Sequence, residues 1–158
     1  MTAIFATIGA LFGYMVGATQ NDALLFKNDS AIRKTEASDQ WNFYQAKSGK
    51  QNLADLGAVL ASGGDAARFK SEAERYGKEK QEIMAKAQEL EKRSTDSEAR
   101  SEASMHVHHR WAQGMTLIQI SIALAAITLL TRSHWLQYVS YGAAAVSVGI
   151  GSLALMHV

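Results

Sequence analysis

The sequence predicts an all-α integral membrane protein: three transmembrane helices, with a long antiparallel helical hairpin, coiled-coil-like, between the first and the second. Two observations carry this prediction. All 15 acidic residues, and all 16 basic residues except Arg132, lie between residues 22 and 110, so charge is confined to the middle of the chain. No proline occurs anywhere, which removes the strongest helix breaker and permits long helices.

Three segments contain no charged residue, and each is close to the roughly 20 residues with which a helix crosses about 30 Å of hydrocarbon: residues 3–19, 114–131 and 135–156. We therefore assign the first transmembrane helix to residues 1–20, the second to 114–131 and the third, with the C-terminus, to 135–158. Residues 132–134 form a short loop. A cleaved signal peptide is the alternative for the first segment; a retained helix is favoured because no Lys or Arg precedes it.

Basic residues near the ends of the uncharged segments predict the orientation. Several of them flank the middle segment, against a single Arg132 in the short loop: Lys27, Arg33, Lys34, Arg100 and Arg110. Cytoplasmic segments are enriched in Lys and Arg, so we expect the middle segment and the C-terminus in the cytoplasm of a bacterial inner membrane and the N-terminus outside. The net charge of +1 gives no reason to expect a nucleic-acid partner, and without cysteine there is no disulfide or thiolate metal site.

Residues 21–113 are expected to form the cytoplasmic hairpin, with its turn at 62–65. In Ser62-Gly63-Gly64-Asp65 the glycines can end one helix and Asp65 can cap the next. The returning helix carries a heptad seam, apolar near the turn and serine-rich near the membrane: Phe69, Ala73, Tyr76, Lys80, Ile83, Ala87, Leu90, Ser94, Ser97, Ser101, Ser104, His108 and Trp111. We expect its serine half to be wet, loosely packed or shaped around something else.

The outgoing helix carries a cluster of aromatic residues inside a charged stretch. Trp41 and Tyr44 share one face, which we expect to pack across the hairpin near residues 82–87. We expect the same face to continue toward the turn through Ser48, Leu53, Leu56 and Leu60. Phe43 points in another direction, which suggests contact with a neighbouring subunit. A ligand pocket is the alternative, but aromatics at helical spacing usually pack in a core.

Small residues form stripes on two of the predicted transmembrane helices. Gly9, Gly13 and Gly17 recur every four residues along the first, and such a stripe lets another helix approach closely in lipid. Ala145 and Gly149, with Ser147 and Gly151, give the third a similar surface. These residues predict helix packing, within a bundle or between subunits, and chance occurrence in a glycine-tolerant span is the alternative.

The stretch before the second transmembrane helix contains a histidine cluster. On a helix His106, His109 and Arg110 share one face, and two histidines three residues apart could supply two metal ligands. Glu102 or a symmetry mate could add a third. Two ligands do not make a site, so we favour a belt of His, Arg and Trp among lipid headgroups, and predict no bound metal and no cofactor.

Several short runs resemble a known family. They include Asn21-Asp22-Ala23-Leu24-Leu25, then Ala37-Ser38-Asp39-Gln40-Trp41 with Tyr44-Gln45-Ala46-Lys47-Ser48, and later a His-His-Arg run, Gln119-Ile120-Ser121-Ile122-Ala123-Leu124 and a Thr131-Arg132 turn. Together they resemble the bacterial membrane proteins of domain-of-unknown-function family 4337. The resemblance implies three spans and a helical middle segment, and it supplies no activity and no catalytic residue.

The function predicted from these features is non-enzymatic, because no phosphate-binding glycine loop, nucleophile elbow or dinucleotide fingerprint is present. We expect an inner-membrane protein that self-associates and presents its cytoplasmic helices as a scaffold or partner-binding element. The expected partners are membrane lipid, further copies of the chain and an unidentified protein. The alternative is a homo-oligomeric channel or passive conduit, and a weaker one is a metal-responsive sensor. No charged residue lies at mid-membrane, which argues against an active transporter.

Overall fold

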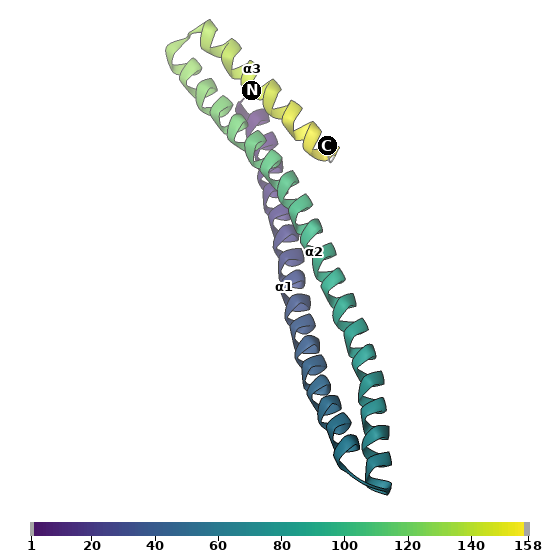
Figure 1. Cartoon of the computed structure of the whole chain (residues 1–158). Helices are drawn as coiled ribbons and strands as arrows, with labels where there is room; N and C mark the ends of the chain where they lie inside the picture. The colour runs from purple at the N-terminus through teal and green to yellow at the C-terminus, as the bar shows by residue number, and fades with distance from the viewer. Residues whose placement is uncertain (1, 157–158) are drawn as a thin grey trace. The chain divides into compact units, whose positions relative to one another are not determined.

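The computed structural model describes residues 2–156, and over this range it contains three α-helices and no strand: α1 (Thr2–Leu60), α2 (Gly64–Thr131) and α3 (His134–Leu155) (Figure 1). The all-α prediction is therefore confirmed. The residues group into two compact units. One comprises the described residues up to Phe26 and from Ala99 onward, which we call the three-helix unit. The other, Lys27–Glu98, we call the hairpin unit.

In the hairpin unit α1 and α2 run antiparallel, as the ion pairs Lys27–Glu98 and Lys47–Glu79 show. The break between the helices covers residues 61–63, slightly earlier than the predicted 62–65. Gly63 has a φ of +63°, the left-handed conformation that glycine adopts without a Cβ penalty. Asp65 lies inside the first turn of α2 rather than at its cap, where its carboxylate still complements the helix dipole.

The contact between the two helices of the hairpin unit is made mainly by small residues. The buried positions are Ser30, Ala37, Ala54, Ala73, Ala87, Ser94 and Ser97. Those on α2 belong to the predicted heptad seam, so this helix does turn the seam toward α1. Small side chains bury little apolar area but allow the two backbones to come close.

In the three-helix unit the first part of α1, the second part of α2 and all of α3 pack together. Their core cluster consists of Phe12, Trp111, Ile118, Ala144 and Ala154. With 22 residues, α3 is about 33 Å long at 1.5 Å per residue, close to the thickness of a bilayer's hydrocarbon layer.

All three helices are long and apolar enough to cross a membrane. Only 6%, 17% and 28% of their most apolar windows, in chain order, are buried inside the protein. Burial in a protein core therefore does not explain why these helices are apolar. Their apolar side chains, such as Leu130 and Val146, face outward, as expected for helices surrounded by lipid.

The connection between α2 and α3 consists of Arg132 and Ser133, one residue shorter than predicted. Arg132 has a φ of 52°, and its N–H donates to the carbonyl of Thr128 at 2.9 Å. This is the single hydrogen bond of a helix end capped by a left-handed residue. A two-residue connection keeps the adjoining ends of α2 and α3 next to each other.

Candidate functional site

The aromatic cluster of α1 contacts α2. The rings of Trp41 and Tyr44 meet edge to face at 5.6 Å between centroids, and Trp41 Nε1 donates to Glu91 Oε1 at 2.8 Å. The ammonium of Lys80 lies 5.2 Å from the centre of the Tyr44 ring. These contacts support packing across the hairpin, with Trp41 about one turn farther from the hairpin turn than expected.

Charged side chains pair across the hairpin. Lys47 bonds to Glu79, and this hydrogen bond is the main reason why the pKa of Glu79 is lowered. Lys27 lowers the pKa of Glu98 in the same way. Pairs that join opposite helices help to set their register, because a shifted hairpin would separate them.

The prediction for the leucines near the turn is wrong. Leu53, Leu56 and Leu60 are 70%, 54% and 75% exposed, whereas Ala54 is 4% exposed and faces α2. Beside it, a Cβ on Gly57 would lie 3.0 Å from the ring of Phe69. The close approach of the helices admits Ala and Gly at the contact, so the larger leucines lie on another face.

Three of the four serines in the serine half of the seam are closely packed against α1. In the hairpin unit Ser94 Oγ donates to the carbonyl of Ser30 at 2.9 Å, and Ser97 Oγ to Asp29 Oδ2 at 2.6 Å. In the three-helix unit Ser101 Oγ donates to the carbonyl of Ala23 at 2.8 Å. All three hydroxyls bond directly to α1, so the two helices are in close contact at these positions. Ser104, the fourth serine of the seam, instead lines a pocket.

The glycine stripe of α1 is divided between two environments. A Cβ on Gly9 would lie 3.4 Å from Ile118 Cγ2, and one on Gly13 would lie 3.5 Å from Met115 Cε. Both glycines therefore face α2 of the same chain. Gly17 has nothing within 4 Å of such a Cβ and remains open. Association between subunits through this stripe stays a prediction, and Gly17 is its accessible member.

The small residues of α3 lie on two different faces. Ser140 and Ser147 are buried and donate to the carbonyls of Ser121 at 2.8 Å and Gly114 at 2.7 Å on α2. Ala145 and Gly149 lie on an exposed face, with nothing within 4 Å of a Cβ on Gly149. Of the four small residues predicted for helix packing on this helix, Ser147 and Gly151 therefore pack within the chain, Gly151 beneath Phe12. Ala145 and Gly149 do not, and their role between subunits stays a prediction.

Only part of the histidine cluster lines a pocket. His106 and Arg110 line a pocket of about 330 Å³ together with Asp22, and His109 is exposed outside it. Nδ1 of His108 lies 3.0 Å from the carbonyl oxygen of Val16 on α1. Within residues 2–156 no three His, Asp or Glu side chains are grouped so that they could hold a metal ion.

Trp111, predicted to lie in a headgroup belt with these histidines, is only 3% exposed. It belongs to the core of the three-helix unit and packs against Phe12. The belt prediction is therefore wrong for Trp111, because its position in the heptad seam turns it toward α1.

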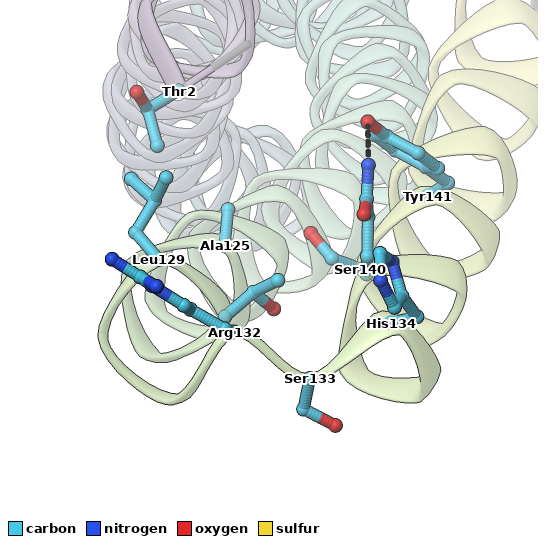
Figure 2. A pocket seen from close by; sticks show the side chains of 10 residues that line it. Thr2, Ala125, Leu129, Arg132, Ser133, His134, Ser140 and Tyr141 are labelled. Atoms are coloured by element: carbon cyan, nitrogen blue, oxygen red, sulfur yellow. Dashed lines mark hydrogen bonds between the residues drawn. The ribbon is translucent and has the colours of Figure 1, made fainter.

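A larger cavity, of about 620 Å³, lies where α2 turns into α3 (Figure 2). Arg132 extends beside Leu129 on the α2 side, and His134 lies beside Ser140 on the α3 side. Gln137 Nε2 donates to Tyr141 Oη at 3.0 Å, as the dashed line marks. We call this space the turn cavity; it is also lined by Thr2, Ala125, Thr128 and Ser133.

Sequence reasoning used Arg132 only for orientation and missed the turn cavity. Its one signal in the sequence was that Arg132 is the only charged residue after Arg110. The cavity also needs Thr2 from the start of the chain, which no local pattern brings to residues 125–141.

Comparison with known proteins gives a match to a family model. No curated protein matches the chain. No solved structure matches it either. A family model matches residues 1–157, nearly the whole length, and the resemblance found in the sequence is thereby confirmed. The chain therefore belongs to the family described as "Domain of unknown function (DUF4337)".

Proposed function

We propose that this protein is a non-enzymatic bacterial inner-membrane protein that self-associates and presents its hairpin unit in the cytoplasm as a scaffold. The observation that carries the proposal is an apolar surface on α1 near the hairpin turn, turned away from α2. This outer face consists of Leu53, Leu56, Val59 and Leu60, which are 54% to 80% exposed.

The outer face lies on a charged pair of helices. Residues 27–98 contain most of the Lys, Arg, Asp and Glu of the chain, so water rather than lipid is the proposed surrounding. Burying one leucine side chain fully contributes about 1.5–3 kcal/mol relative to leaving it exposed. Several apolar side chains grouped on one surface therefore favour docking of another protein surface.

A second copy of the chain is the simplest partner for this surface. Two identical helices can bury the same face against each other about a twofold axis, which is the commonest symmetry of oligomers. Phe43, 58% exposed and farther from the hairpin turn on α1, offers an additional contact.

The charges of the hairpin also fit a scaffold. Lys47 and Glu79 satisfy each other across the interface, and Arg33 bonds to Asp29 at 2.8 Å. We assign the pair that joins the two helices to helix register rather than to catalysis, whereas the Arg33–Asp29 pair lies within α1.

The alternative function, a channel, has less support than the scaffold. It required a wet vestibule along the serine seam, and Ser94, Ser97 and Ser101 are buried and bonded to α1. We therefore prefer the scaffold to the conduit.

Cysteine cross-linking of the full-length protein in native membranes tests the proposal. The chain contains no cysteine, so Leu56→Cys introduces a single thiol. Lys78→Cys, on the exposed side of α2, is the matched control. We expect mild oxidation to yield a covalent dimer of Leu56→Cys, and adding Leu53→Gln and Leu60→Gln to suppress it. Equal yields from Leu56→Cys and Lys78→Cys would rule out self-association through the outer face.

A further inference from the structure

We propose that the turn cavity binds a membrane phospholipid, with its phosphate on Arg132 and the start of an acyl chain against Leu129 and Ala125. The inference rests on the proposed membrane location of the chain but not on its scaffold role, and it concerns the three-helix unit.

The charge of the turn cavity calls for an anion from outside the protein. Arg132 and His134 stand on its two sides, and Arg132 makes no ion pair with any of the described residues. The sequence holds no Asp or Glu after Glu102 and none before Asp22, so no carboxylate belongs to the segments that line the cavity. A phosphate group is the natural complement, because guanidinium groups bind it with charge-assisted hydrogen bonds.

The backbone at Arg132 supports a role for its side chain. The two interhelical connections each contain one residue in the left-handed region: Gly63 at +63° in the first and Arg132 at 52° in the second. For a residue with a Cβ this conformation is unfavourable. The second turn therefore carries an arginine at a position where glycine would adopt the backbone conformation more easily. A function of the guanidinium group explains why an arginine occupies this position.

The surroundings place the cavity at the depth of lipid headgroups. Trp135 and Tyr138, at the start of α3, are 71% and 74% exposed, and aromatic residues gather at membrane–water interfaces. Leu130, just before Arg132, is 85% exposed at the end of an apolar segment. Arg132 thus lies at the boundary between apolar and polar surface, where lipid phosphates are found.

The lining of the turn cavity favours a lipid over free phosphate. Ala125 and Leu129 form an apolar wall below the charged rim, which inorganic phosphate would leave unused. A phosphate joined to hydrocarbon satisfies both parts of the lining.

Native mass spectrometry of the full-length protein in detergent, titrated with phosphatidylglycerol, tests the proposal. We expect one retained lipid per chain and no comparable retention of diacylglycerol, which lacks the phosphate. The key variant is Arg132→Gly. It removes the charge, and because glycine suits a φ of 52° the turn should be kept or stabilised. We expect it to weaken lipid binding about tenfold, as for loss of a charge-assisted hydrogen bond.

Two further variants define the site. Ala125→Phe fills the cavity and should also weaken binding, whereas Arg100→Ala, an arginine of the same unit that stacks on Phe26, should not. The proposal is overturned if Arg132→Gly retains phosphatidylglycerol like the wild type or if Arg100→Ala loses it equally. It is also overturned if Ala125→Phe binds normally, or if inorganic phosphate binds at Arg132 while the lipid does not.

Discussion

Phe12 of α1 meets Trp111 of α2 edge to face, with ring centroids 5.1 Å apart and an angle of 71° between the ring planes. The same phenyl ring fills the space above two glycines. A Cβ on Gly114 of α2 would lie 2.9 Å from Phe12 Cε2, and one on Gly151 of α3 would lie 2.5 Å from its Cζ. One side chain therefore joins all three helices of the three-helix unit.

This arrangement predicts that Gly151→Ala destabilises the three-helix unit, by about 1–3 kcal/mol as for other overpacked cores. The matched control is Gly149→Ala on the exposed face of α3, where the new methyl group meets nothing within 4 Å. Its effect should be neutral or slightly stabilising, since Ala favours helix more than Gly. Thermal unfolding of the full-length protein in detergent, followed by circular dichroism, measures both.

Phe12→Leu should partly rescue Gly151→Ala, because a smaller side chain leaves room for the methyl group. If Gly151→Ala and Gly149→Ala melted at the same temperature, Phe12 would not fill the space beside Gly151.

Ser147→Ala should also destabilise the three-helix unit. The hydroxyl is buried and donates to the carbonyl of Gly114 at 2.7 Å, and interhelical bonds of this kind contribute about 0.6–1.7 kcal/mol in membranes. Ser152→Ala is the control, because Ser152 is exposed and bonds to its own helix at Gly149. The same melting experiment distinguishes them, and an equal effect of the two substitutions would show that the contact with α2 contributes nothing.

The hairpin unit should lose stability in acid. The pKa values of Glu79 and Glu98 are lowered in the folded state by hydrogen bonds from Lys47 and Lys27. Stability from a lowered carboxyl pKa is fully present above the ordinary glutamate pKa and is lost as the pH falls through the folded-state value. We expect the melting temperature to drop between neutral pH and about pH 3, where carboxylates protonate.

Glu79→Gln should reduce this dependence on pH, whereas Glu74→Gln, exposed on the same helix, should leave it unchanged. Melting curves of both variants at the two pH values check the assignment. A drop of the same size in Glu79→Gln and in the wild type would contradict it.

The glycine stripe predicts different outcomes for two similar substitutions. Gly13→Leu should lower the melting temperature, because the side chain would run into Met115 of α2. Gly17→Leu should leave the fold stable, and it should reduce the oligomer seen by native mass spectrometry if subunits meet along this stripe. An unchanged oligomer in Gly17→Leu would remove the stripe from the association surface.

The histidines should not form a metal site. His106 lines a pocket together with Arg110, whereas His109 does not. We expect zinc to bind the wild type no more tightly than it binds the variant His106→Ala/His109→Ala in isothermal titration. Clearly tighter binding by the wild type would restore the sensor hypothesis.

Much of the architecture could be read from the sequence because the relevant signals are local. The uncharged segments mark the three apolar helices, and Gly63 and Gly64 mark the break between α1 and α2. The residues of the heptad seam recur alternately four and three positions apart. This spacing identified the face of α2 that includes Ala73, Ala87 and Ser94. Helical periodicity also placed Trp41 and Tyr44 against α2. In each case the properties of neighbouring residues suffice.

The tertiary structure decided which of several similar faces points inward. Leu53 could not be told from Ala54, nor Gly149 from Gly151, because each pair offers two plausible contact faces. Gly17 could not be told from Gly13, because both lie on one stripe of α1 and only the position of α2 separates them. Where a helix faces lipid, its outside is as apolar as its inside, so hydrophobicity does not orient it and close packing does. In the hairpin unit the close approach of α1 and α2 places Ala54, rather than Leu53, at the contact. The turn cavity arises in the same way, because it exists only where the start of α1 meets the reversal at Arg132.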